Sequence, residues 1–295
     1  KWPTHFIEVQ QDGKGGKIVW EWHIWDHLVQ DTDDQKPNFG VIAEHPELID
    51  INMRSSGGGK PGRGDGDWFH VNGIDYNADL DQLVFTSRFM SEFYIIDHST
   101  TTEEAATHEG GNAGKGGDIL FRYGKPANYG SSSTQSIAAA CHDPRWIKSG
   151  RPNAGYIQFF NNEGGSGRSS VVDAVNPEME SDGYNYKFSN GSFQPTSKEW
   201  RHECKETATG QSASDRMSNG NVFVNLSRKY MYEMDTDGNV VWQYSASTPK
   251  AFRFECDYPG IIALLDDPCD VLSSSDFNIS NINVYPNPNT GIVRI

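Results

Sequence analysis

The chain has 295 residues, of which 36% are hydrophobic and 12% aromatic, so it is long enough to bury a large core. Its formal net charge of −15 excludes nucleic acids and anionic membranes as general partners, because most of the surface would repel them. An anionic ligand would therefore need a local cationic pocket. No apolar run approaches the roughly 20 residues of a membrane-spanning helix, so we expect no membrane span.

The first 22 residues predict two strands joined by a turn. Trp2 to Gln10 and Ile18 to Trp22 (IVWEW) have strand character, and Asp12 to Lys17 lies between them. Two strands are fewer than the four in each unit that follows. We therefore expect the chain to start inside a repeat unit, so that either further units precede Lys1 or the fold closes in another way.

Three later stretches, Phe69 to Gly124, Ala140 to Phe188 and Gln211 to Tyr244, repeat one pattern of four short strands. Each opens with a short polar segment that leads into the first strand. In the first stretch the expected second, third and fourth strands are Asp81 to Ser87, Glu92 to Asp97 and Asp118 to Tyr123. In the second stretch they are Gly155 to Asn161, Ser169 to Val175 and Tyr184 to Phe188. In the third stretch they are Asn221 to Ser227, Lys229 to Asp235 and Asn239 to Tyr244. Four short strands with turn residues between them are typical of a propeller blade. The sequence therefore predicts an all-β protein, a β-propeller of four-stranded blades that is incomplete at its N-terminus.

Polar residues recur at matching places in the three units. The heads of the first strands carry His70, His142 and Ser212, and an arginine precedes each third strand, at Arg88, Arg168 and Arg228. The first strand of every propeller blade lines the central channel. We therefore expect histidines and arginines to meet at one mouth of that channel and to form an anion site.

Several longer motifs resemble the bacterial arylsulfotransferase family. They are Trp22 to Asp31 (WHIWDHLVQD), Asp67 to Asn77 (DWFHVNGIDYN), Ile95 to Thr101 (IIDHSTT) and His142 to Ile147 (HDPRWI), extended by Asn219 to Asn221, Ala251 to Phe254 and Tyr258 to Gly260. The resemblance covers most of Trp2 to Ile262. It implies a six-bladed propeller that moves a sulfuryl group from an aryl sulfate ester to a phenol, with neither a nucleotide sulfate donor nor a cofactor.

The resemblance also implies roles for individual residues. His70, His142 and Arg168 become the catalytic candidates that bind or polarise the sulfate, while Asn72 and Arg88 become substrate-binding candidates. Fixed cations and hydrogen-bond donors suit sulfuryl transfer because charge gathers on the peripheral oxygens. A histidine can also attack the sulfur and form a covalent intermediate.

One departure from the family pattern concerns the nucleophile. The resemblance places the attacking histidine at the head of the first strand of the last blade, where this chain has Gln211 to Asp215 (QSASD). Two explanations follow. Either another histidine attacks, with His202 in the preceding connection as one candidate, or the chain is a non-catalytic secreted or cell-surface propeller that binds a ligand or has a structural role.

The four cysteines, Cys141, Cys204, Cys256 and Cys269, allow up to two disulfides with three connectivities, among which the sequence does not choose. They form no CxxC pair and no Cys/His metal spacing, and we predict no metal site. The glycine-rich stretches Gly57 to Gly66 and Gly110 to Gly117 lack the spacing of a phosphate-binding loop.

The C-terminal part changes character after about Asp270. We expect the propeller over residues 1–270, a linker over 271–281 and a different segment over 282–295. The run Val284 to Gly291 (VYPNPNTG) resembles the start of the sorting domain that Bacteroidetes attach to cargo of the type IX secretion system. The resemblance implies that secretion machinery as a partner and a secreted or outer cell-surface location, with an ordinary Pro/Asn turn as the alternative.

Overall fold

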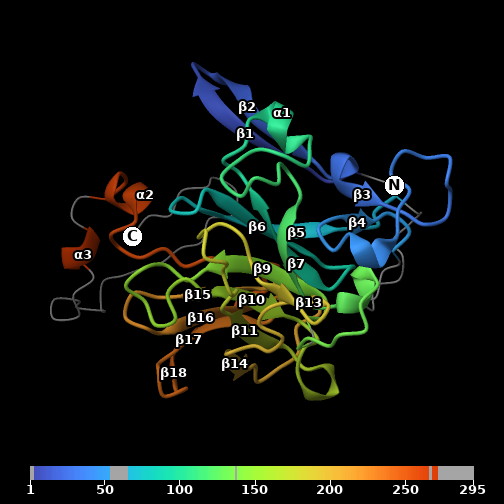
Figure 1. Cartoon of the computed structure of the whole chain (residues 1–295). Coiled ribbons are helices and arrows are strands. Elements are labelled where there is room, and N and C mark those ends of the chain that lie inside the picture. Colours follow the sequence, from blue (N-terminus) through green and yellow to red (C-terminus); the bar gives the residue numbers. More distant parts are fainter. Residues whose placement is uncertain (1–2, 54–65, 137, 266–267, 272–295) are drawn as a thin grey trace. The chain divides into compact units, whose positions relative to one another are not determined.

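The computed structural model describes residues 3–53, 66–136, 138–265 and 268–271. The chain divides into two compact units, Lys1–Phe252 and Arg253–Ile295 (Figure 1). Residues 272–281 of the expected linker and the whole expected sorting segment, 282–295, lie outside the described residues. No helix in the described ranges is long and apolar enough to cross a membrane.

The first unit is built around three four-stranded antiparallel sheets. The first sheet has the order β5 (Val71–Asn77), β6 (Gln82–Ser87), β7 (Glu92–Asp97) and β8 (Ile119–Tyr123). The second has the order β9 (Cys141–Trp146), β10 (Ile157–Asn161), β11 (Val171–Val175) and β14 (Trp200–Glu203). The third has the order β15 (Ala213–Arg216), β16 (Val222–Leu226), β17 (Tyr230–Met234) and β18 (Val240–Tyr244). These sheets confirm the all-β class and the four-stranded repeat, as in a propeller. The six blades stay a prediction.

The predicted fourth strand of the second sheet, Tyr184 to Phe188, is wrong. The structure uses β14 instead, which pairs with β11 and adds an ion pair of 2.6 Å between Arg201 Nε and Asp173 Oδ1. The alternating pattern at 184–188 serves another purpose, because the buried ring of Tyr186 packs on Phe121 of the first sheet. Phe188–Ser189 (β12) then pairs with Ser192–Phe193 (β13) in a small hairpin.

The N-terminal part forms smaller elements. β1 (His5–Asp12) and β2 (Gly15–His23) make a two-stranded sheet of their own, with a tighter turn than the sequence predicts. β3 (Leu28–Val29) pairs in parallel with β4 (Ile49–Asp50). The short helices of the first unit are η1 (Ile24–His27), η2 (Ile42–Glu44), α1 (Thr102–Ala105), η3 (Pro126–Tyr129) and η4 (Ser166–Arg168).

The second unit contains the short helices α2 (Pro259–Ile262) and α3 (Pro268–Val271). A disulfide joins Cys256 to Cys269 within this unit. Cys141 and Cys204, by contrast, are buried free thiols of the first unit. The structure therefore forms one of the two disulfides that the sequence allows, between two cysteines 13 positions apart.

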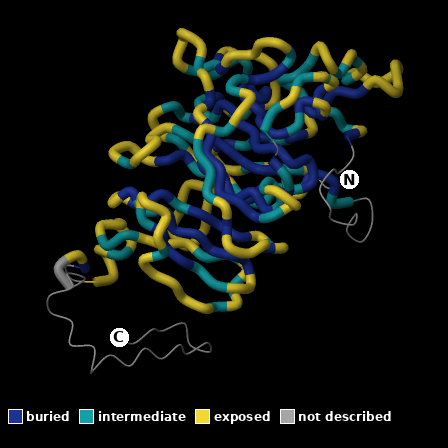
Figure 2. Tube along the Cα trace, turned by 90° about the horizontal axis from the view of Figure 1, so that it is seen from below, coloured by how far each residue is buried: buried dark blue, intermediate teal, exposed yellow. Residues whose placement is uncertain are grey.

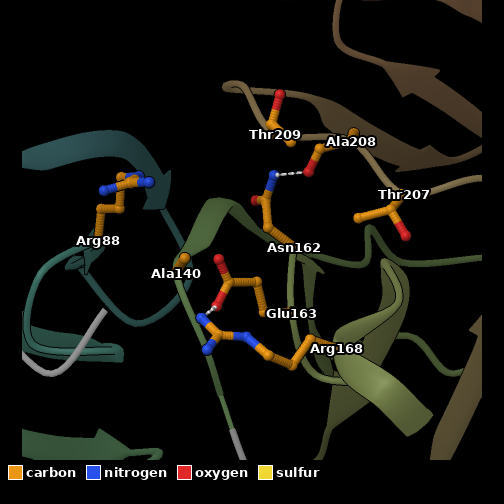
Figure 3. Close-up of a pocket in the computed structure, with 8 residues that line it drawn as sticks. All are labelled: Arg88, Ala140, Asn162, Glu163, Arg168, Thr207, Ala208 and Thr209. Carbon is orange, nitrogen blue, oxygen red and sulfur yellow. Dashed lines mark hydrogen bonds and ion pairs between the residues drawn. The ribbon is translucent and has the colours of Figure 1, made fainter. Parts of the chain in front are cut away.

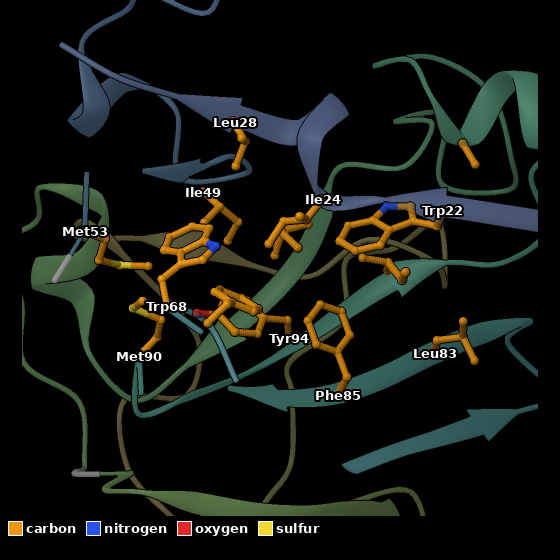
Figure 4. Close-up of a cluster of buried hydrophobic side chains, with 14 of the residues drawn as sticks. Trp22, Ile24, Leu28, Ile49, Met53, Trp68, Leu83, Phe85, Met90 and Tyr94 are labelled. Carbon is orange, nitrogen blue, oxygen red and sulfur yellow. The ribbon is translucent and has the colours of Figure 1, made fainter. Parts of the chain in front are cut away.

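Three hydrophobic clusters hold successive layers of the first unit together. The first joins the segment around Trp22 to the face of β6 and β7 that carries Phe85 and Tyr94 (Figure 4). The second lies between the first and second sheets, and the third lies between the second and third sheets. Figure 2 shows the buried residues concentrated along the strands and the exposed ones along the connections. Burial of each large side chain contributes about 1.5–3 kcal/mol, so this stacking sets the positions of the strand ends where the polar residues lie.

Candidate functional site

The start of each first strand shows how the sheets correspond to one another. His70, Ala140 and Ser212 each precede a first strand directly and have left-handed backbones, with φ of 53°, 52° and 57°. Positive φ is uncommon for residues other than glycine, so three such residues at one place mark equivalent positions. The prediction that His70 and His142 are equivalent was therefore wrong. His142 lies two residues further along and corresponds to Asn72.

A cavity of about 450 Å³ lies at the ends of these strands (Figure 3). Its lining comes from four connections and consists of Arg88, Ala140, Asn162, Glu163, Arg168, Thr207, Ala208 and Thr209. Arg88 directly follows β6, whereas Arg168 belongs to the connection between β10 and β11. Arg88 and Arg168 thus line one cavity, whereas neither of the histidines expected beside them, His70 and His142, is among its lining residues.

The two arginines differ in how their charge is used. Arg168 forms an ion pair with Glu163, and 66% of its side chain is exposed. Arg88 has no carboxylate partner among the residues that the structure describes, and its guanidinium carbon lies 5.4 Å from the centre of the Phe89 ring. The positive charge of Arg88 is therefore more available to an anion than that of Arg168.

His142 is held in a single tautomer. Its Nδ1 lies 2.8 Å from the carbonyl oxygen of Ala140 and 2.7 Å from Oδ1 of Asn162. Asn162 Nδ2 donates to the carbonyl oxygens of Ala208, at 2.9 Å, and Gly210, at 2.6 Å, which determines which way the amide points. Both neighbours of the His142 Nδ1 are thus acceptors, so Nδ1 carries the hydrogen. The lone pair of the neutral ring is on Nε2.

The surroundings of His142 also keep the ring neutral. Burial, with smaller contributions from the positive charges of Arg88 and Lys250, lowers the pKa of His142 to about 4, against the opposing effect of the hydrogen bonds to Asn162 and Ala140. At neutral pH the ring therefore offers an uncharged nitrogen close to two fixed cations. This combination suits attack on, or polarisation of, an anionic substrate.

His70 lies beside Arg88 but does not line the cavity. Its Nδ1 is hydrogen-bonded to the carboxylate of Asp67, and its ring lies 4.7 Å from that of Phe89. The backbone N–H of Arg88 donates to the carbonyl oxygen of His70 at 3.1 Å. Because 40% of the His70 side chain is exposed, the ring is accessible to solvent or a bound molecule.

The amide of Asn72 is engaged within the fold. Its Nδ2 donates to the carbonyl oxygen of Cys141 at 3.2 Å, and its Oδ1 accepts from the Thr86 hydroxyl at 3.0 Å. The amide therefore joins the first strands of neighbouring sheets. His202 lies on β14, at the far edge of its sheet from β9, and its Nε2 is 2.7 Å from the hydroxyl oxygen of Tyr232.

Sequence reasoning missed two residues of this site. Asn162 directly follows β10 as Arg88 directly follows β6, so the repeat contained a signal for it. Lys250 had no such signal. Its Nζ lies 2.9 Å from Asp143 Oδ1 and 3.3 Å from the carbonyl oxygen of Asn72, a residue 178 positions away in the chain.

The fold and site define a propeller-like β-protein with a neutral imidazole near a guanidinium that has no carboxylate partner among the described residues. The family described as Arylsulfotransferase (ASST) matches residues 5–192. The chain belongs to this arylsulfotransferase family. No curated protein matches it.

Three solved structures show weak similarity. BamB from Moraxella catarrhalis is 14% identical with a TM-score of 0.29, and the match covers 59% of this chain. Hsv2 from Kluyveromyces lactis is 11% identical with a TM-score of 0.31 and a coverage of 60%. A protein of unknown function from Bacteroides caccae is 11% identical with a TM-score of 0.26 and a coverage of 60%. The chain spans 35%, 46% and 61% of their respective lengths. TM-scores this low define neither the fold nor the activity.

Proposed function

We propose that the protein transfers a sulfuryl group from an aryl sulfate ester to a phenolic acceptor without a nucleotide donor. Family membership supports this substrate class. The observation that carries the proposal is the state of His142, a neutral ring with its hydrogen held at Nδ1 and its lone pair at Nε2. Ala140 and Asn162, the hydrogen-bond partners of this ring, line a cavity of about 450 Å³, which is within the usual size range for small-molecule sites.

The first half of the reaction uses His142 as the nucleophile. Its Nε2 lone pair forms a bond to sulfur while the bond from sulfur to the aryl oxygen breaks, and that electron pair leaves with the aryloxide. Positive charge develops on the ring, so the hydrogen bonds from Nδ1 to Asn162 and to the Ala140 carbonyl strengthen. Arg88 stabilises the negative charge on the sulfuryl oxygens.

The second half returns the enzyme to its starting state. His70, which gave a proton from Nε2 to the departing aryloxide in the first half, now accepts the proton of the phenol, with Asp67 orienting its ring through Nδ1. The phenol oxygen then forms a bond to sulfur, and the electron pair of the N–S bond returns to His142. Arg168, already paired with Glu163, is better placed to shape the rim of the cavity than to hold the sulfuryl group.

The non-catalytic alternative rests on the missing histidine at Gln211 to Asp215. His142 offers a nucleophile from the neighbouring sheet, so that absence does not count against catalysis. No observation on the described residues favours the alternative independently.

A trapping experiment tests the proposal. The purified chain is mixed with nitrophenyl sulfate in the absence of acceptor, quenched rapidly and digested. We expect release of nitrophenol and a mass gain of one SO₃ group on the peptide that carries His142, with no such label in His142→Ala. His202→Ala serves as the control and should label normally. Unchanged turnover in His142→Ala would overturn the assignment of the nucleophile.

We also propose that the protein is exported, by the type IX secretion machinery, to the outside of the cell. The VYPNPNTG motif supports the route. The disulfide between Cys256 and Cys269 supports an oxidising compartment, since such bonds form mainly outside the cytoplasm. Removal of residues 282–295 should retain the protein inside the cell, as measured by fractionation of native cells, whereas unchanged export would contradict the route.

A further inference from the structure

A second group of histidines lies away from the cavity just described. His27 is the last residue of η1, His108 follows α1, and Asp118 directly precedes β8. Nδ1 of His27 and Nδ1 of His108 each lie 2.8 Å from the same oxygen, Oδ1 of Asp118. The sequence separates these residues by up to 91 positions, so only the fold brings them together.

Both ring nitrogens of His27 lie next to oxygen atoms that accept hydrogen bonds. Its Nε2 lies 2.8 Å from the carbonyl oxygen of Ala105, which only accepts, so Nε2 carries a hydrogen. A neutral ring then points the lone pair of Nδ1 at the carboxylate oxygen of Asp118. Two electron-rich atoms at 2.8 Å repel each other, and His27 is fully buried, so this contact requires either a second proton on the ring or a cation between the two atoms.

A metal ion at this point would remove the conflict. Histidines that bind metals commonly donate the hydrogen of their other ring nitrogen to a backbone carbonyl, as His27 does to Ala105. The second histidine supplies another nitrogen ligand, and the candidate ligand atoms of the three residues lie within 4.8 Å of one another. Two imidazoles and one carboxylate form a donor set that suits Zn²⁺.

We propose that His27, His108 and Asp118 form a binding site for a divalent transition-metal ion, with Zn²⁺ as the preferred ion. Zinc bonds of about 2.0–2.1 Å in a tetrahedron place ligand atoms about 3.3 Å apart. The ligand atoms must therefore move apart by roughly half an ångström from 2.8 Å. His108 can supply this movement for its own contact with Asp118, because 60% of its side chain is exposed, whereas the contact between His27 and Asp118 must widen by a rotation of the carboxylate. The same exposure leaves the fourth coordination position open to water.

The surrounding contacts indicate a structural role for the metal. Trp22 stacks on His27, with ring centres 5.4 Å apart and an interplanar angle of 3°, and its Nε1 donates to the carbonyl oxygen of Gly117 at 2.7 Å. A Cβ on Gly117 would lie 2.5 Å from Nε2 of His27, so this close approach requires glycine. The ion would thus fasten the long connection between β7 and β8 to η1.

A second group of two histidines and a carboxylate, on the β1–β2 hairpin, can be compared with the proposed metal site. Oε2 of Glu21 lies 3.2 Å from Nε2 of His5 and 3.1 Å from Nε2 of His23. Neutral rings that carry hydrogen on Nε2 satisfy both contacts, so this partly exposed group has no donor and acceptor conflict. Ordinary hydrogen bonds account for it without a metal.

Metal binding by the full chain tests the proposal. The protein is stripped with a chelator and titrated with Zn²⁺ in a calorimeter, with Co²⁺ absorption as a second probe. We expect about one ion per chain and a rise in Tm of about 5 °C at saturating Zn²⁺, because a ligand that binds only the folded state stabilises it. His108→Ala, at an exposed side chain, should weaken binding at least about 10–100-fold and abolish the rise in Tm.

Matched controls are available elsewhere in the chain. His45→Ala removes a similarly exposed histidine that pairs with Glu47 at 3.0 Å and should leave binding unchanged, as should His5→Ala. Binding that survives in His108→Ala, binding that is lost in His5→Ala, or no saturable binding of either ion would overturn the site. Since none of these measurements uses sulfuryl transfer, their outcome is independent of the function proposed above.

Discussion

The first and second sheets each bring one histidine towards the proposed site, but the two imidazoles have opposite surroundings. His70 is 40% exposed at its side chain and pairs with the carboxylate of Asp67. His142 is buried, its Nδ1 meets only neutral oxygens, and two cations lie near. The environment therefore decides the chemistry of the same side chain: proton exchange suits His70, and nucleophilic attack suits His142.

The largest expected effect separates these two histidines. His142→Ala should lower kcat by about 10⁴-fold or more, because it removes the nucleophile. His70→Ala should lower kcat by about 10²–10³-fold for a phenyl sulfate and by less for a nitrophenyl sulfate, whose leaving group needs less protonation. Steady-state kinetics with both donors measures the difference. A larger loss in His70→Ala would reverse the comparison.

The arginines give the next largest difference between the sheets. Arg88→Ala should lower kcat by about 10²–10³-fold, because it removes the positive charge that stabilises the sulfuryl oxygens. Arg168→Ala should change kcat only a few-fold, since Glu163 already neutralises that guanidinium. Equal losses in the two variants would show that the ion pair opens when substrate binds.

The burial of His142 predicts how stability depends on pH. Its folded-state pKa of about 4 lies below the ordinary value of 6.5, so folding favours the neutral ring. The resulting stabilisation is present above pH 6.5 and is lost as the pH falls towards 4. The loss amounts to about 3 kcal/mol. Denaturant unfolding at several pH values should show this loss in the wild type and a weaker dependence in His142→Gln; identical slopes would contradict it.

The smallest expected effect concerns the residue that orients His142. Asn162→Asp places a carboxylate next to Nδ1 and should raise the pKa of His142, so the acid limb of kcat/KM should move to higher pH by about one unit. The surface substitution Asn219→Asp adds the same charge in an exposed turn and should leave the limb in place. A pH profile that does not move in Asn162→Asp would mean that the amide only fills space.

Much of the fold follows from local pattern. The second and third strands of all three units were predicted to within a few residues, because short alternating runs between turns favour strands. The fourth strand of the second sheet was missed, because alternation at 184–188 shows that one side of the segment is buried and does not show against what. The ring of Tyr186 packs on the first sheet instead.

The candidate site was predictable to a smaller extent. The sequence repeat predicted that Arg88 and Arg168 lie near each other, and both line one cavity. The same repeat assigned His142 to the wrong position along its strand. The equivalent position in the second sheet is Ala140, which is recognised by its positive φ. No pattern of side chains in the sequence indicates that backbone conformation. Lys250 was missed for a related reason, since nothing in its local sequence indicates a partner 178 positions away.

The sequence by itself determined the repeating four-stranded units, the acidic surface and the residue types available for chemistry, because these depend on local alternation and composition. The tertiary structure alone decided which nitrogen of His142 carries its hydrogen, that Arg168 pairs with a carboxylate, and that His27, His108 and Asp118 meet. Protonation, charge pairing and metal binding depend on distances of a few ångströms between residues far apart in the chain. Such distances exist only after the sheets have packed.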